Sequence, residues 1–191
     1  MNLPNKLTLI RMIATPIFML AMVTNFPGHY IVALIIFILA SITDALDGNI
    51  ARKQNLVTDF GKFLDPLADK MLTTSAFLGF LAAHVCPGIT WIVFIVLFRE
   101  FAITSLRLVC VGSGKVIAAN IWGKAKTVSQ MLSIIITIFF MALNELVTFS
   151  QGFRVFVVIT VTALLWICAI LTVISGVIYL KENKEAIDPT K

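Results

Sequence analysis

Six long apolar runs, separated by short breaks, account for most of the chain. Each run contains about 20 residues, which is the length that an α-helix needs to cross a bilayer. The breaks contain turn residues, among them Pro27-Gly28 and Pro87-Gly88. Because backbone polar groups must be satisfied within lipid, helices are the spanning element that this pattern predicts. The predicted spans are Leu7–Asn25, Tyr30–Arg52, Gly61–His84, Ile89–Cys110, Gly123–Leu146 and Phe153–Leu180.

The composition supports this prediction. The chain is 59% hydrophobic and 13% charged, with a mean hydropathy of +0.99. Such values are typical of a polytopic membrane protein, and no polar stretch is long enough to build a soluble domain. We therefore expect an all-α membrane protein of six transmembrane helices, forming a single domain over residues 1–191. Three isolated cysteines lack metal-ligand spacing and are interpreted as small packing residues, and no nucleic-acid motif is evident.

The distribution of positive charge predicts the orientation. If the N-terminus is cytoplasmic, fourteen of the fifteen Lys and Arg residues lie at the inner ends and inner loops, and Arg154 alone lies outside. Both termini and the active face are then cytoplasmic, at the plasma membrane. No A-x-A cleavage site follows the first apolar run, so we interpret that run as a retained span. His29 and His84 fall at the outer ends, where we expect no chemical role.

Half of the acidic residues gather in one window of the chain. They are Asp44, Asp47, Asp59, Asp65 and Asp69, out of ten acidic residues in all. Asp44 and Asp47 are spaced i, i+3, and Asp65 and Asp69 are spaced i, i+4, so each pair lies on one face of its helix. If the two helices are antiparallel neighbours, the four carboxylates can converge. Oxygen ligands of this kind suit a hard divalent cation such as Mg²⁺ or Mn²⁺.

Other polar positions allow two interpretations each. Asn5 is a plausible helix N-cap on the same face as Thr8, and Arg11, one turn on, is either a snorkelling cation or a functional one. Arg99 lies deep in the fourth span, either in an ion pair with Glu100 or an aspartate, or in an anion pocket.

The start of the fifth span carries Lys124 and Lys126, which suit either a phosphate or anionic lipid headgroups. Beyond these lysines, we expect the fifth and sixth spans to carry almost no polar chemistry inside the bilayer, because their Ile, Phe, Leu and Val content is typical of lipid contact and packing. The exceptions are Gln130, Asn144 and Glu145, which are expected to make hydrogen bonds between helices or at the interface.

The aspartate window follows the pattern D-x2-D-G-x2-A-R-x8-G-x3-D-x3-D. Its defined positions are Asp44, Asp47, Gly48, Ala51, Arg52, Gly61, Asp65 and Asp69. This pattern resembles the signature of the CDP-alcohol phosphotransferase family, and the six-helix layout and Asn5-x2-Thr8-x2-Arg11 also look like that family. The later set Arg99-Glu100, Arg107 and Gly123-Lys124-x-Lys126-Thr127 is similar to its phosphatidylglycerophosphate synthase branch.

The resemblance implies an enzyme that uses two divalent cations, Mg²⁺ or Mn²⁺. It implies that Asp44, Asp47, Asp65 and Asp69 bind metal and that Asp69 also acts as the general base. Nucleotide contacts are implied for Asn5, Thr8, Gly48, Ala51, Arg52 and Gly61. Contacts with the acceptor phosphate would come from Arg99, Arg107, Lys124 and Lys126, with Lys115 a weaker candidate. The small residues Gly48 and Ala51 also fit simple helix packing.

The implied reaction transfers the phosphatidyl group from CDP-diacylglycerol to sn-glycerol 3-phosphate and releases CMP. The implied partners are these two substrates, membrane lipid and a second copy of the chain in a homodimer. Two alternatives remain open at this point. One is the same family with another acceptor, either cardiolipin-type, inositol phosphate or serine. The other is a cation-coupled transporter, disfavoured because the acids lie at one end of their helices rather than near the midplane.

Overall fold

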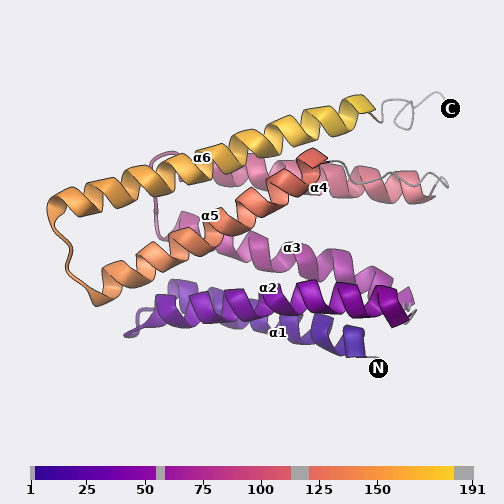
Figure 1. The fold of residues 1–191 in the computed structure, drawn as a ribbon, viewed down its shortest axis with the longest axis horizontal. Coiled ribbons are helices and arrows are strands. Elements are labelled where there is room, and N and C mark those ends of the chain that lie inside the picture. The colour runs from indigo at the N-terminus through magenta and orange to yellow at the C-terminus, as the bar shows by residue number, and fades with distance from the viewer. Residues whose placement is uncertain (1–2, 55–58, 113–120, 183–191) are drawn as a thin grey trace. The chain divides into compact units, whose positions relative to one another are not determined.

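The computed structural model describes residues 3–54, 59–112 and 121–182, with the backbone alone described for residues 3–5, 45–54, 59–66, 69, 108–109 and 111–112. These residues form helices joined by short turns and contain no strand (Figure 1). The all-α prediction is therefore confirmed for the described part of the chain. The helices are α1 (Leu3–Val23), α2 (His29–Gln54), α3 (Asp59–Ala82), α4 (Ile89–Gly112), α5 (Ile121–Leu146) and α6 (Gln151–Glu182).

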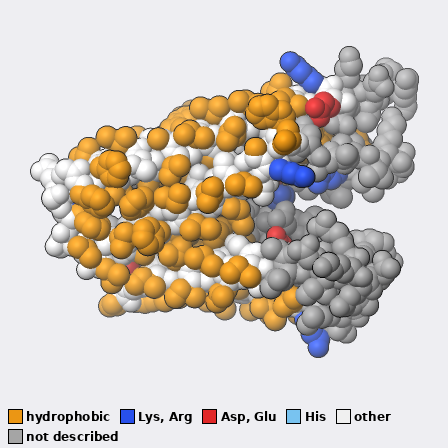
Figure 2. All heavy atoms as spheres, in the orientation of Figure 1, with side chains coloured by type: hydrophobic (Ala, Val, Ile, Leu, Met, Phe, Trp, Pro, Cys, Tyr) orange, Lys and Arg blue, Asp and Glu red, His pale blue; other side chains and the backbone are white. Residues whose placement is uncertain are grey.

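Four of these helices, α1, α4, α5 and α6, are long and apolar enough to cross a membrane. Among residues with described side chains, α2 and α3 contribute the shorter apolar segments His29–Asp44 and Lys70–Ala82. Large apolar side chains are exposed on every helix, and Figure 2 shows them over most of the described surface on its face. A surface of this kind is typical of contact with lipid rather than water. The six-span count and the orientation stay predictions.

Contacts divide the chain into two compact units. The first unit contains Met1–His84 and Ile134–Val157, and the second contains Val85–Ser133 and Val158–Lys191. Helices α1, α2 and α3 therefore belong to the first unit and α4 to the second, whereas α5 and α6 each contribute a part to both.

In the first unit, α1 packs against both α2 and α3. Its buried residues recur at helical spacing and change in character along the helix. Thr8, Arg11 and Thr15 are buried nearer its N-terminus, whereas Phe18 and Met22 are buried nearer its C-terminus. One face of α1 thus supplies polar contacts near its N-terminus and apolar packing further along.

The apolar half of that face packs closely. The rings of Phe18 and Phe37 lie 5.7 Å apart between centroids, joining α1 to α2. On α3, a Cβ atom added at Gly79 would come within 2.9 Å of Met22 Cε. The same added atom would lie 3.1 Å from Met22 Cβ, so α1 and α3 approach each other closely at this level.

The turn between α1 and α2 is fixed by a residue from α5. Gly28 adopts φ +80°, a conformation that favours glycine, and the next residue begins α2. The Glu145 carboxylate accepts hydrogen bonds from the backbone N–H groups of Gly28 and Tyr30. A carboxylate there satisfies donors that the first turn of a helix leaves unpaired and complements the helix dipole. The prediction that Glu145 makes hydrogen bonds between helices is confirmed.

The second unit contains α4 with parts of α5 and α6. Its apolar core includes Ile92, Val96 and Leu165. Gly88, at φ +76° in the turn before α4, would bring an added Cβ within 3.1 Å of the Trp166 indole. All three cysteines of the chain are free and buried, as expected for packing residues, and burial raises the pKa of the Cys86 thiol in that turn.

The expectation that α5 and α6 carry almost no polar chemistry is wrong. Helix α5 buries Lys126, Gln130 and Ser133, and α6 buries Thr172 and Ser175, so both carry polar chemistry in their interiors. Ser133 Oγ lies 2.7 Å from the Ser129 carbonyl oxygen and 3.3 Å from the Leu164 carbonyl oxygen, so it contacts both helices. Single polar residues in an apolar run resemble lipid-facing positions in sequence, but here they form contacts within the protein.

We predict that Glu145→Ala destabilises the first unit by about 1 kcal/mol, the usual value of a helix cap. The reason is the loss of the acceptor for the Gly28 and Tyr30 N–H groups. The measurement is the midpoint of thermal unfolding in detergent. Asn144→Ala, at the exposed neighbouring residue, is the control and should leave the midpoint unchanged. Equal midpoints for Glu145→Ala and Asn144→Ala would contradict the assignment.

Candidate functional site

The N-terminal polar residues lie in the first turns of α1. Helix α1 begins at Leu3, so the expectation that Asn5 is its N-cap is wrong. Pro4 explains this early start, because proline is tolerated in the first helical turn, where its missing N–H costs no hydrogen bond. Thr8 and Arg11 are 1% and 3% exposed, so both side chains face protein rather than lipid or water. The sequence allows Arg11 to be either a snorkelling cation or a functional one, and its burial excludes snorkelling to the surface.

Arg11 forms an ion pair with Asp44, the first aspartate of the predicted metal site. Arg11 Nη1 contacts Asp44 Oδ1 and so joins α1 to α2. The side chain of Arg11 is 3% exposed, whereas that of Asp44 is 42% exposed. The buried cation therefore holds a carboxylate that remains accessible, which is how an outer-shell residue orients a metal ligand. Sequence analysis placed Arg11 on the face of Thr8 but missed this pairing.

Asp44 and Asp69 lie at equal distances from the adjoining ends of α2 and α3. Helices α2 and α3 run in opposite directions, with the end of α2 followed by the start of α3 (Figure 1). Asp44 lies ten residues before the end of α2 at Gln54, and Asp69 lies ten residues after the start of α3 at Asp59. At 1.5 Å per residue, both lie about 15 Å along the axis from those ends. The opposite helix directions assumed for the metal site are thus present in the backbone, whereas the close approach of α2 to α3 stays a prediction.

Several predicted site residues lie outside the residues whose side chains are described. They are Asn5, Asp47, Gly48, Ala51, Arg52, Gly61, Asp65 and Asp69, together with Lys115. The helix bounds place Asn5 in α1, the next four in α2, and Gly61, Asp65 and Asp69 in α3. The convergence of the four carboxylates therefore stays a prediction.

An apolar cavity of about 220 Å³ lies between α1 and α2, on the N-terminal side of Asp44. It is lined by Ile10, Arg11, Ala14, Ile36, Leu39, Ala40 and Thr43. The Thr43 hydroxyl donates to the Leu39 carbonyl oxygen at 2.7 Å, so its proton is already hydrogen-bonded within α2. The cavity thus offers an apolar wall that ends at the Arg11–Asp44 ion pair.

In the second unit, the residues expected to bind phosphate have different environments. Lys126 is 3% exposed, and its Nζ forms an ion pair with Glu100 Oε1, which joins α5 to α4. Arg99 Nη2 instead donates to Ser175 Oγ on α6 at 2.9 Å. The expected ion pair of Arg99 with Glu100 is therefore not formed, because α6 holds Arg99 and α5 supplies the partner of Glu100.

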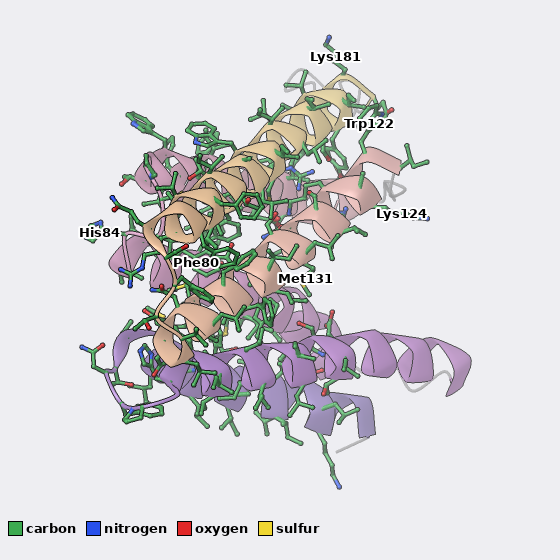
Figure 3. The ribbon with its side chains drawn as sticks, turned by 60° about the vertical axis from the view of Figure 1, so that its left-hand side comes forward. Phe80, His84, Trp122, Lys124, Met131 and Lys181 are labelled. Carbon is green, nitrogen blue, oxygen red and sulfur yellow. The ribbon has the colours of Figure 1, made fainter. Side chains whose placement is uncertain are left out.

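Arg107 and Lys124 are both exposed. Figure 3 shows Trp122 and Lys124 near the start of α5, with Met131 further along the same helix. The four predicted cations thus fall into an inner pair, Arg99 and Lys126, and an outer pair, Arg107 and Lys124. Sequence analysis missed Ser175, although a Ser-Gly pair stands out within a run of Ile, Val and Leu.

Comparison with known proteins identifies the family. Residues 1–178 match the family described as CDP-alcohol phosphatidyltransferase. The chain belongs to the CDP-alcohol phosphatidyltransferase family. The family resemblance drawn from the aspartate pattern is confirmed, and with the apolar helices it makes the chain an integral membrane protein. Enzymes of this family generally use divalent metal ions.

Similar proteins cover almost the whole chain. A Bacillus subtilis protein named CDP-diacylglycerol–glycerol-3-phosphate 3-phosphatidyltransferase is 41% identical over 97% of both chains. A Rickettsia bellii protein of the same name is 38% identical over 96% of both chains. A Mycobacterium tuberculosis protein named probable phosphatidylglycerophosphate synthase is 42% identical over 70% of this chain and 64% of its own length.

We predict that Glu100→Ala lowers the stability of the second unit by about 3–5 kcal/mol, because Lys126 would remain buried without its carboxylate. The double variant Glu100→Leu with Lys126→Met, which removes both charges and keeps the volume, should recover most of the loss. Thermal unfolding in detergent measures both. A double variant as unstable as Glu100→Ala would show that the loss comes from packing rather than from the unpaired charge.

Proposed function

We propose that this enzyme transfers the phosphatidyl group of CDP-diacylglycerol to sn-glycerol 3-phosphate and releases CMP. The observation that carries the proposal is the 41% identity, over 97% of both chains, to a protein named for that reaction. The aspartate pattern supports the chemistry, because it puts one pair of acidic residues on each of two helices that run in opposite directions (Figure 1). Arg99 on α4 supports a phosphorylated acceptor rather than a neutral one, because its hydrogen-bond partner Ser175 on α6 is uncharged.

The residues present fit a divalent metal centre. We propose Asp44, Asp47, Asp65 and Asp69 as ligands, since carboxylate oxygens are preferred by Mg²⁺ and Mn²⁺. The accessible carboxylate of Asp44, oriented by a buried arginine, is the structural support for this assignment. Two such ions, when bound, stabilise the negative charge on the attacking and leaving oxygens of a phosphoryl transfer.

Asp69 is proposed as the general base that accepts the proton of the acceptor hydroxyl. A base must lie within hydrogen-bond reach of that proton, and Asp69 is the aspartate furthest into α3. Arg11 is proposed to keep Asp44 in one orientation through their ion pair. The Asp44 carboxylate then needs no rearrangement when a metal ion binds to it.

The nucleotide is proposed to lie along the first half of α1 and the second half of α2. Thr8 faces protein on α1, and Gly48 and Ala51 form a bare i, i+3 patch that admits a flat ligand. Arg52 can bind a phosphate bidentately, whereas Asn5 and Gly61 complete the family pattern. The apolar cavity between α1 and α2 has the chemistry for a segment of a lipid acyl chain.

The acceptor phosphate is proposed to be bound by Arg99, Arg107, Lys124 and Lys126. We further propose a homodimer in the plasma membrane with six spans, both termini cytoplasmic and the active site at the cytoplasmic face. The support for this orientation is the bias of Lys and Arg toward one side. It matches the substrates, because the donor is a lipid and the acceptor is a water-soluble phosphate.

The activity test supplies CDP-diacylglycerol and Mg²⁺ or Mn²⁺ to the purified protein and measures CMP release. We expect release with glycerol 3-phosphate and none after chelation of the metal. Inositol phosphate, serine and phosphatidylglycerol serve as competing acceptors. Release with one of these but not with glycerol 3-phosphate would assign the chain to another acceptor within the family.

The assignment of the base predicts that Asp69→Asn lowers turnover by about 10²-fold or more, the usual range for a lost general base. Binding of Mn²⁺ and of a cytidine nucleotide should fall much less, because three carboxylates remain. Asp44→Asn is the comparison. It leaves the base in place but removes the carboxylate that Arg11 orients, so it should weaken Mn²⁺ binding more than Asp69→Asn does. Equal losses of binding and turnover in Asp69→Asn would refute its role as the base.

A further inference from the structure

The guanidinium group of Arg99 lies against two small residues of α6. Arg99 Nη2 donates to Ser175 Oγ at 2.9 Å, and Ser175 is 1% exposed. At the adjacent Gly176, which is also buried, an added Cβ would lie 3.2 Å from Arg99 Cγ and 3.6 Å from Nε. One residue therefore fixes an end of the guanidinium, and the other leaves room for the stem. We call Ser175 and Gly176 the Arg99 contact surface.

This contact leaves most of the guanidinium available. An arginine carries five N–H donors and no acceptor, and Arg99 uses one of them on Ser175. Its Nε is buried without a hydrogen-bond partner. A buried unpaired donor is unfavourable, so this arrangement is explained if a ligand supplies the missing acceptor.

The charge of Arg99 is also preserved. Within the described part of the chain no carboxylate pairs with it, because Glu100, its neighbour in sequence, contacts Lys126. A full positive charge with buried donors in a planar fork matches an anion with several oxygens, such as a phosphate.

We propose that Ser175 and Gly176 are positioning residues that hold Arg99 for the phosphate of the acceptor. This inference rests on the proposed function, and it adds α6 to the parts of the chain that determine acceptor binding. The hydrogen bond and the packed stem restrict the rotamers of Arg99 before the acceptor arrives. Binding then costs less conformational entropy than it would with a freely rotating arginine.

The test compares Ser175→Ala and Gly176→Ala with the wild type in steady-state kinetics. For Ser175→Ala we expect KM for glycerol 3-phosphate to rise about tenfold, the loss typical of one hydrogen bond to a charged group. For Gly176→Ala we expect the same KM to rise because the added Cβ would displace the Arg99 stem. KM for CDP-diacylglycerol and kcat should change little, because the lost interaction concerns acceptor binding. Ser175→Thr, which keeps an accepting oxygen, should lie closer to the wild type than Ser175→Ala.

The matched control is Thr172→Val, one turn earlier on α6. Thr172 is fully buried, and its hydroxyl donates to the Cys168 carbonyl oxygen of the same helix at 2.7 Å. Thr172→Val therefore removes a buried hydroxyl from α6 without touching Arg99, and both KM values should stay at the wild-type level. An unchanged acceptor KM in Ser175→Ala, or equal increases in both KM values, would overturn the positioning role.

Failure of the proposed function gives a different result. If the wild type releases no CMP with glycerol 3-phosphate, the acceptor assignment fails, and the Arg99 contact surface is then tested with inorganic phosphate. The measurement is the increase in thermal unfolding midpoint caused by phosphate. A smaller increase in Ser175→Ala than in Thr172→Val supports the anion site. Equal increases, or no increase in the wild type, overturn it.

Discussion

A charged group removed from water needs a partner, and this requirement accounts for the polar contacts in both units. In the first unit, buried Arg11 meets Asp44 across α1 and α2. In the second, buried Lys126 meets Glu100 across α5 and α4. Each pair joins two helices at a defined position, so each favours one pairing of the faces of those helices. In a chain that exposes apolar side chains on every helix, these pairs supply directional contacts that apolar packing cannot.

The helices themselves could be predicted from the sequence, because apolar length and turn residues are local signals. Predicted and observed ends differ by a few residues, and the start of α4 at Ile89 and the end of α5 at Leu146 agree. The polar interior of α5 and α6 could not be predicted. A lone hydroxyl in an apolar run has the same local sequence whether it bonds its own helix, as Thr172 does, or another helix, as Ser175 does.

In the candidate site, too, local features could be predicted from the sequence, whereas contacts between helices could not. The aspartate spacing is local, so the shared face of each pair and the family could both be predicted from it. The partner of Asp44 could not, because Arg11 lies on another helix and its own neighbours suggest only a cation near the membrane surface. Likewise Glu100 and Lys126 are distant in sequence, and adjacency favoured Arg99 as the partner of Glu100. Tertiary packing decides between equally charged candidates, and only the structure contains that information.

The two inner cations of the second unit differ in what their partners do to their charge. Glu100 neutralises Lys126, so that pair contributes mainly to holding α4 and α5 together. Ser175 is neutral, so it orients Arg99 and leaves its positive charge intact. A carboxylate at position 175 would also orient the guanidinium, but it would cancel the charge that attracts an anion. A hydroxyl beside a glycine is therefore suited to an arginine that must be both fixed and charged, and Arg99 has more positive charge available to a phosphate than Lys126, which shares its charge with Glu100.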